Sequence, residues 1–193
     1  MATGEHRVCP WWFGYLLLSP LRRIRQSPTK LLGSLVSPGM TVLEPGPGMG
    51  YFTLDIARMV GPSGRVVAVD VQDRMLRTLR RRAARAGLLA RIDLRRVEPG
   101  SLGVEDLAGR IDRVLAIFVV HEMPDAGRFF AEAHRALVGG GRLLFAEPKR
   151  HVTRDEFERS LETAQRTGLA SLGAFRFPGA RAVLLARSAA TGG

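Results

Sequence analysis

Cysteine is nearly absent from this sequence, whose 193 residues include only one, Cys9. A single thiol excludes an internal disulfide framework and a metal site built from several cysteines. A chain of this length can still bury about two-thirds of its unfolded surface, so we expect one domain that folds without a disulfide and without a metal ion. A lone thiol fits a reducing compartment, and we expect a cytoplasmic protein.

Long apolar runs are also missing. None reaches the roughly 18 residues of a membrane helix, so we expect no membrane span. The apolar stretch Trp11–Leu18 leads into arginines without a small-residue cleavage site, which disfavours a secretory signal and favours a short helix. Its aromatic residues have two open interpretations, either a lid over an acceptor site or a helix packed on a sheet: Trp11, Trp12, Phe13 and Tyr15.

Lysine is the third scarcity. Of 29 basic residues only Lys30 and Lys149 are lysines, which leaves 27 arginines, and the net charge is +11. Nine of the arginines and a single acid, Asp93, fall within Arg74–Arg96. Such a run either binds nucleic acid, anionic lipid or an acidic partner, or forms the solvated face of a helix. No aromatic residue interleaves it, so we favour the solvated face and expect no specific nucleic-acid partner.

Strand and helix patterns alternate along most of the chain. A short helix at Ser27–Val36 begins with Pro28 at its first helical position and precedes a break at Pro38-Gly39. We then expect strands at Thr41–Glu44, Arg65–Asp70, Arg91–Val97, Arg113–Val120 and Arg142–Glu147. Between and after them we expect helices at Tyr51–Val60, Asp73–Ala86, Ala126–Leu137 and Thr153–Thr167, with glycines 139–141 ending the third.

The end of the chain has the pattern of an antiparallel pair, Phe175–Phe177 and Ala182–Ala186, around a Pro178-Gly179 turn. Strands that alternate with helices indicate an α/β fold, a mostly parallel sheet with helices on both faces. We expect a helical cap at residues 1–38, the main domain at 39–188 and a tail at 189–193.

A glycine-rich loop follows the first strand and opens the first helix, with glycines at positions 46, 48 and 50. Glycine lets the backbone approach a ligand closely, and the helix start behind it offers free N–H groups. A dinucleotide fingerprint would need its third glycine at position 51, which is Tyr51, and a P-loop would need a following Gly-Lys-Ser/Thr. The loop therefore predicts a nucleoside ligand other than NAD or FAD.

Asp70 ends the second strand, 20 residues after Gly50. A carboxylate there can accept two hydrogen bonds from a ribose diol. The alternative is an N-cap for the next helix, but the combination with the glycine loop favours ribose.

This combination resembles the class I S-adenosylmethionine-dependent methyltransferases. The acid-x-Gly-x-Gly-x-Gly loop matches Glu44 to Gly50, the acid after strand two matches Asp70, and Val138–Leu144 resembles the turn into strand five. The segments around Asp112–Glu122 and Glu132–Leu137 are closest to the small-molecule branch that includes quinone C-methyltransferases. The resemblance implies a Rossmann-like seven-stranded sheet in the order 3-2-1-4-5-7-6, with strand seven antiparallel.

It also implies S-adenosylmethionine as the cofactor, bound over the C-terminal ends of strands one, two and four. Glu44 would hold the amino-acid end, because a carboxylate suits an ammonium. After strand three the family often has Gly-Asp-Ala, but this chain has Val97-Glu98-Pro99-Gly100, so either Glu98 or the backbone of Ser101-Leu102 contacts the adenine. The full set of expected cofactor contacts is Glu44, Gly46, Gly48, Gly50, Asp70, Val71, Glu98 and Phe118.

His121 is the candidate catalytic base, because it follows strand four where the family's acceptors bind and titrates near neutral pH. It could instead be a loop histidine bonded to the backbone, or a residue that only shapes the acceptor site. Glu122 and Glu147 are weaker candidates, and Glu147 could orient His121 or cap the turn at Pro148. Cys9 is not expected to be a nucleophile.

The sequence thus predicts methyl transfer to a small molecule. No motif specifies the identity of this acceptor, its reacting atom or the number of subunits. Two other functions stay open. One is a nucleic-acid methyltransferase that uses the basic region, although Val119–Met123 lacks the Asn/Asp-Pro-Pro-Tyr/Phe motif of base-amino enzymes. The other is a regulator that binds the cofactor without turnover.

Overall fold

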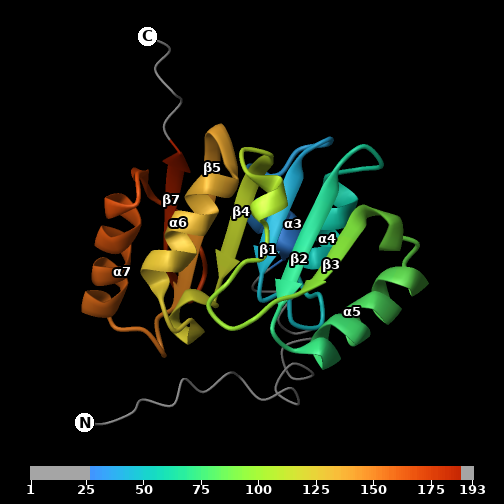
Figure 1. Ribbon diagram of the computed structural model, residues 1–193, viewed down its shortest axis with the longest axis horizontal. Helices are drawn as coiled ribbons and strands as arrows, with labels where there is room; N and C mark the ends of the chain where they lie inside the picture. The colour runs from blue at the N-terminus through green and yellow to red at the C-terminus, as the bar shows by residue number, and fades with distance from the viewer. Residues whose placement is uncertain (1–26, 188–193) are drawn as a thin grey trace.

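Seven strands form one twisted sheet in the order β3-β2-β1-β4-β5-β7-β6 (Figure 1). The computed structural model describes residues 27–187. The expected helix at Trp11–Leu18, its aromatic cluster, Cys9 and the tail at 189–193 lie outside this range. The strands are β1 Thr41–Pro45, β2 Arg65–Asp70, β3 Ile92–Arg96, β4 Ile111–Ile117, β5 Leu137–Pro148, β6 Leu169–Ala174 and β7 Ala180–Arg187.

The pairing confirms the expected topology. β3, β2, β1, β4 and β5 run parallel, whereas β7 is antiparallel to both β5 and β6. A parallel neighbour requires a long crossover, which the helices supply, while β6 and β7 are joined by a short turn and so must be antiparallel. All carboxyl ends of the five parallel strands therefore meet at one edge of the sheet.

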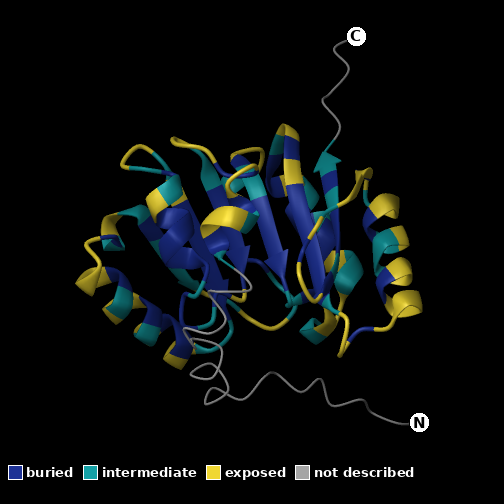
Figure 2. Ribbon diagram, turned by 180° about the vertical axis from the view of Figure 1, so that it is seen from behind, coloured by how far each residue is buried: buried dark blue, intermediate teal, exposed yellow. Residues whose placement is uncertain are grey.

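Helices cover both faces of the sheet. They are α3 Pro28–Leu32, α4 Thr53–Met59, α5 Asp73–Arg85, α6 Ala126–Ala136 and α7 Arg154–Arg166. One buried cluster joins α3, α4 and α5 to one face, through residues such as Leu32, Ile56 and Leu79. A second joins α6 and α7 to the other, through Phe130 and Phe157. Figure 2 shows the result: the central strands are buried, and the exposed residues lie on outer helix faces, on loop tips and on the edge strand β6.

Several predicted boundaries were wrong, including the end of α3, which is Leu32 rather than Val36. β4 ends at Ile117 rather than Val120, because Phe118 has a φ of 62° and leaves the extended conformation. Glycines 139–141 do not separate α6 from β5 but lie within β5, which begins directly at Leu137.

The sixth strand is Leu169–Ala174, not Phe175–Phe177. Only its first residue is buried, so this edge strand has no apolar alternation to reveal it, and pairing with β7 holds it in place. Among residues 27–187, no helix is long and apolar enough to cross a membrane.

Candidate cofactor and acceptor site

A cavity of about 550 Å³ opens at the carboxyl ends of β1, β2 and β4. Parallel α/β sheets bind ligands at this edge, where loops rather than strands meet. The lining includes six of the eight cofactor residues expected from the sequence: Glu44, Gly46, Gly48, Asp70, Val71 and Phe118. Gly50 and Glu98 are not among the lining residues.

The glycine loop requires glycine for two separate reasons. Gly46, Gly48 and Gly50 have φ values of 64°, 54° and 83°, a region that side chains disfavour. A Cβ on Gly46 would also stand 2.7 Å from a methyl group of Val119, and one on Gly50 would collide with Leu79. Gly50 is therefore a packing residue between the loop and α5, and Gly46 brings β1 close to the end of β4.

Glu44 is a buried carboxyl group at the end of β1. The residue is 4% exposed, and its Oε2 atom has no hydrogen-bond partner of acceptable geometry among the described residues. Burial raises the pKa of Glu44 to about 7; the neighbouring Thr53 hydroxyl opposes this rise and the charge of Asp70 adds to it. An unsatisfied buried acceptor beside a cavity is suited to a cationic ligand group.

Asp70 is 8% exposed at the end of β2, where its Oδ1 accepts a hydrogen bond from the backbone N–H of Gln72 at 2.8 Å. Burial raises its pKa to about 6, although backbone N–H groups of Gln72, Gly48 and Val71 oppose the rise. The N-cap of α5 is Gln72, so Asp70 is not that cap. Its carboxyl group faces the cavity beside the glycine loop.

The segments after β3 and β4 complete the wall. Phe118 holds its positive φ with its N–H bonded to Ala146 O at 2.8 Å and its ring 5.4 Å from that of Phe177. A non-glycine residue in this conformation is strained, and such strain concentrates at ligand sites.

After β3, Glu98 is exposed, whereas Ser101 and Leu102 line the cavity. Of the two adenine contacts left open by the sequence, this placement favours the Ser101-Leu102 backbone.

His121 lines the same cavity and is held by Glu147 from the end of β5. The ring Nδ1 lies 2.5 Å from Glu147 Oε2, and the His121 backbone N–H donates to Oε1 at 3.1 Å. Glu147 is 1% exposed, whereas the imidazole is 23% exposed. Burial lowers the pKa of His121, but the hydrogen bond and charge of Glu147, with the charge of Glu122, outweigh it and raise the pKa. Of the two interpretations of Glu147, the structure therefore supports the orientation of His121.

His151 also lines the cavity, although no sequence motif marks it as a functional residue. It follows β5 in the turn before α7, and its ring centroid lies 6.2 Å from that of His121 in an edge-to-face arrangement. No motif surrounds it, so only the fold brings the two imidazoles together.

The arginine-rich segment is partly built into the fold. Arg77 pairs with Asp73, Arg82 donates to Met49 O in the glycine loop, and Arg91 donates to Ala57 O. These contacts explain several of the nine arginines without a partner molecule. Six of the nine arginines are exposed at the surface: Arg74, Arg77, Arg80, Arg81, Arg85 and Arg96.

Comparison with known proteins decides the family. A family model described as a methyltransferase domain matches residues 43–145, which include the glycine loop, Asp70 and His121. The chain belongs to this methyltransferase family. Its cofactor is therefore S-adenosylmethionine.

Two curated relatives are named methyltransferases. A ubiquinone/menaquinone biosynthesis C-methyltransferase, UbiE, of Pasteurella multocida is 32% identical over 112 residues, which cover 58% of this chain and 41% of the relative. An arsenite methyltransferase of Halobacterium salinarum is also 32% identical over 112 residues, which cover 58% of this chain and 28% of that relative. The match thus spans about two-fifths or less of each relative's length.

Among solved structures, an S-adenosylmethionine-dependent methyltransferase of Aquifex aeolicus superposes with a TM-score of 0.82 at 22% identity. The match covers 93% of this chain and all of the other. At that identity the likeness confirms the fold of the methyltransferase domain.

The residues of the cavity fit S-adenosylmethionine. Among the described residues, Glu44 offers a buried carboxyl oxygen without a hydrogen-bond partner for the ammonium, and no atom stands within 4 Å of a Cβ placed on Gly48. Asp70 offers a carboxyl group for ribose hydroxyls one strand away. Within residues 27–187, no cluster of three or more His, Cys, Asp or Glu side chains could hold a metal ion.

Proposed function

We propose that this protein transfers a methyl group from S-adenosylmethionine to a small-molecule acceptor that loses a proton in the reaction. The observation that carries the proposal is that one cavity holds both a cofactor set, Glu44 and Asp70, and a histidine oriented by a buried carboxylate. When bound, the cofactor supplies an activated sulfonium methyl group. The protein must then align the acceptor and exclude water, because proximity and orientation dominate such a step.

On the cofactor side, Glu44 binds the ammonium and Asp70 binds the ribose hydroxyls. Gly46 and Gly48 bring the backbone close to the ligand between these two carboxyl groups. Val71, beside Asp70, and Phe118, at the end of β4, contribute contacts from the cavity wall. The adenine end rests against Ser101-Leu102, because Glu98 lies outside the lining.

On the acceptor side, His121 is the base. Its Nδ1 is bonded to Glu147, which fixes the ring orientation and leaves Nε2 to take a proton from the acceptor. Phenols and enols fit this site, since they have a weakly acidic hydroxyl group and an apolar body. The nearby Phe118, Met123 and Pro124 provide apolar contacts for such a body.

The pH dependence follows from the raised pKa of His121. Below that pKa the imidazole is protonated and cannot accept a proton, so activity should rise with pH through a value above 6.5. Glu147→Gln removes the charge that raises the pKa and should move this rise to lower pH.

A nucleic-acid acceptor is the second candidate, because of the net charge of +11. The carboxyl groups of Glu44, Asp70 and Glu122 within the cavity disfavour a phosphate there, and several arginines are engaged with the fold. A regulator that binds the cofactor without turnover is the third candidate.

The single cysteine, Cys9, supports a cytoplasmic setting as part of the proposal.

The test has a binding arm and a transfer arm. Calorimetry should give heat with S-adenosylmethionine and S-adenosylhomocysteine but none with NAD, and the reverse result would refute the cofactor assignment. Labelled S-adenosylmethionine is then incubated with a panel of phenols, hydroquinones and total RNA. Label in the phenols supports the proposal, label in RNA supports the second candidate, and binding without any transfer supports the third.

His121→Gln separates proton transfer from shape. Glutamine keeps hydrogen bonding but cannot act as a base at neutral pH, so kcat should fall by about 10²–10⁴-fold. Cofactor affinity should change by less than about threefold. A near-normal kcat would mean that His121 only shapes the acceptor site, and a raised KM alone would agree with that alternative.

A further inference from the structure

The loop after β3 forms one wall of the cavity. Residues 97–104, here called the β3 loop, include Pro99, Gly100, Ser101 and Leu102 among the lining residues. β3 pairs with β2 on the side away from β1, so this wall lies beyond Asp70. A nucleoside whose ribose is bound by Asp70 therefore places its base against the β3 loop.

The inner side of the β3 loop is held by a buried carboxyl group from α6. Glu132 is 6% exposed, and its Oε2 accepts a hydrogen bond from the backbone N–H of Leu102 at 2.7 Å. Its Oε1 accepts from Arg128 Nε at 2.8 Å. Leu102 is 1% exposed, so its N–H has little access to water if Glu132 is removed. An unsatisfied buried N–H group is costly, and the loop would move to relieve it.

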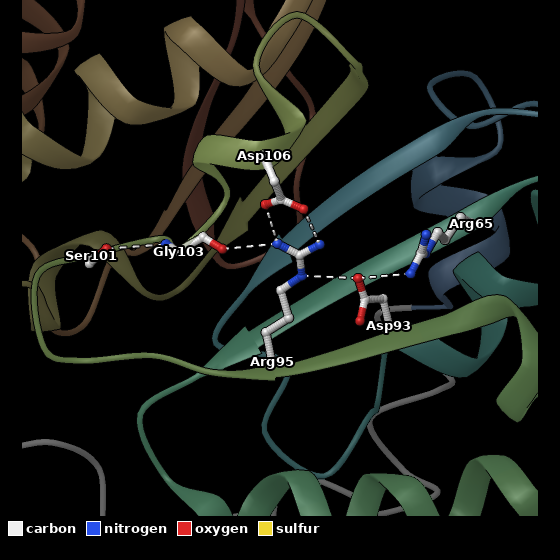
Figure 3. A network of polar contacts seen from close by, with 6 residues as sticks. All are labelled: Arg65, Asp93, Arg95, Ser101, Gly103 and Asp106. Atoms are coloured by element: carbon white, nitrogen blue, oxygen red, sulfur yellow. Dashed lines mark hydrogen bonds and ion pairs between the residues drawn. The ribbon is translucent and has the colours of Figure 1, made fainter.

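The outer side of the same loop is held by Arg95 (Figure 3). Its Nη1 donates to Gly103 O at 3.0 Å and to Asp106 Oδ1 at 2.6 Å, while its Nε donates to Asp93 at 2.9 Å. Within the loop, the Gly103 N–H donates to Ser101 Oγ at 3.1 Å. Each of the consecutive residues Leu102 and Gly103 is thus held by a charged side chain, Leu102 by the Glu132 carboxylate and Gly103 by the Arg95 guanidinium.

We propose that Glu132 and Arg95 are positioning residues that hold the β3 loop in place for the adenine of the cofactor, and so set the affinity for its adenosine half. The inference rests on the proposed function, in that the cavity binds S-adenosylmethionine. A loop that is already ordered loses less conformational freedom when the ligand binds, which raises affinity. Neither residue lines the cavity, so their effect passes through the loop.

The test compares two ligands, S-adenosylhomocysteine and 5′-methylthioadenosine, which share adenosine but differ in the amino-acid end. Glu132→Ala should lower the affinity for both by the same factor, about tenfold. Glu44→Gln should lower the affinity for S-adenosylhomocysteine alone, because only that ligand carries the ammonium. Glu132→Gln keeps an acceptor for the Leu102 N–H and should recover most of the affinity for both.

Glu158→Ala is the matched control. Glu158 accepts from Arg154 at i,i+4 on α7, just as Glu132 accepts from Arg128 on α6, but no hydrogen bond or ion pair within the described residues joins it to the β3 loop. This variant should bind both ligands as the unmodified protein does. Hydrogen exchange of the Leu102 amide should accelerate in Glu132→Ala and stay unchanged in Glu158→Ala.

Each outcome has a distinct meaning. If Glu132→Ala does not fold, Arg95→Gln carries the same test from the outer side of the loop, where its partner Asp106 is 62% exposed. If the unmodified protein binds both ligands and the folded variants at 132 and 95 bind them equally well, the positioning role is refuted and the proposed function stands. If the unmodified protein binds neither ligand, the proposed function and the positioning role both fail.

Discussion

Replacing Glu44 by Gln should stabilise the ligand-free protein at alkaline pH and at the same time weaken its binding of the cofactor. Glu44 is buried, its Oε2 has no hydrogen-bond partner of acceptable geometry among residues 27–187, and its pKa is raised from 4.5 to about 7. A carboxyl group whose pKa is raised in the folded state contributes stability that is fully present below 4.5 and is lost as the pH rises through 7. Glutamine has no charge to bury, so the variant should not show this loss.

The size of the effect follows from the two pKa values. The pKa of Glu44 rises from 4.5 in the unfolded chain to about 7 in the folded protein. At a pH where the group is ionised in both states, this shift destabilises the folded state by ~3 kcal/mol. Between pH 5 and pH 8, the stability of Glu44→Gln relative to the unmodified protein should therefore rise by about 2–3 kcal/mol. Cofactor affinity of the unmodified protein should fall about tenfold from pH 8 to pH 6, as the carboxylate that binds the ammonium becomes protonated.

Urea unfolding at pH 5 and pH 8, without ligand, measures the stability difference, and calorimetry with S-adenosylhomocysteine measures affinity at pH 6 and pH 8. Glu158→Gln, on the exposed face of α7, serves as the control and should show neither effect. A stability difference that does not change with pH would refute the buried charge at Glu44. An unchanged affinity at pH 8 would refute its contact with the ammonium, whatever the stability.

Three further changes test other parts of the site. Asp70→Ala should weaken cofactor binding by about 1–3 kcal/mol, through the loss of charge-assisted hydrogen bonds, with the fold retained; an unchanged dissociation constant in calorimetry would mean that Asp70 serves only the turn at Gln72. Gly50→Ala should destabilise the protein by about 2 kcal/mol in urea unfolding, because its φ is 83° and a Cβ would collide with Leu79; equal stability would show that the loop can relax. The exposed arginines of α5 include Arg77, Arg80, Arg81 and Arg85, and RNA binding to them, measured across salt concentrations, should be weak, independent of sequence and abolished by moderate salt, as contacts to phosphate alone predict. Nanomolar, sequence-specific binding at physiological salt would contradict this expectation.

The parts of the fold that could be predicted are those in which one short segment carries its own signal. β2 was predicted at both ends because its residues are almost all buried and its sequence is a continuous apolar run closed by Asp70. β6 was misplaced because nearly all its residues are exposed, so its sequence lacks the apolar alternation of a half-buried strand. Its position is set by pairing with β7, which local hydropathy does not report.

The same distinction applies to the site. The spacing of Gly46, Gly48 and Gly50 after Glu44 predicted the loop and the kind of ligand, because conformational demands on consecutive residues are local. The end of β4 was misplaced by three residues, because the positive φ of Phe118 is imposed by its surroundings.

By itself, the sequence determined the order of strands and helices, the glycine loop and the carboxyl groups that end β1 and β2. Only the tertiary structure decided which distant residues act together: Glu147 beside His121, 26 positions away, and Glu132 beneath Leu102, 30 positions away. It also decided that Glu44 is buried, with one carboxyl oxygen that has no hydrogen-bond partner within the described part of the chain, while Glu98 is exposed. The physical reason is that burial and hydrogen bonding depend on neighbours that chain folding brings together, and those neighbours set a carboxyl group's pKa and role.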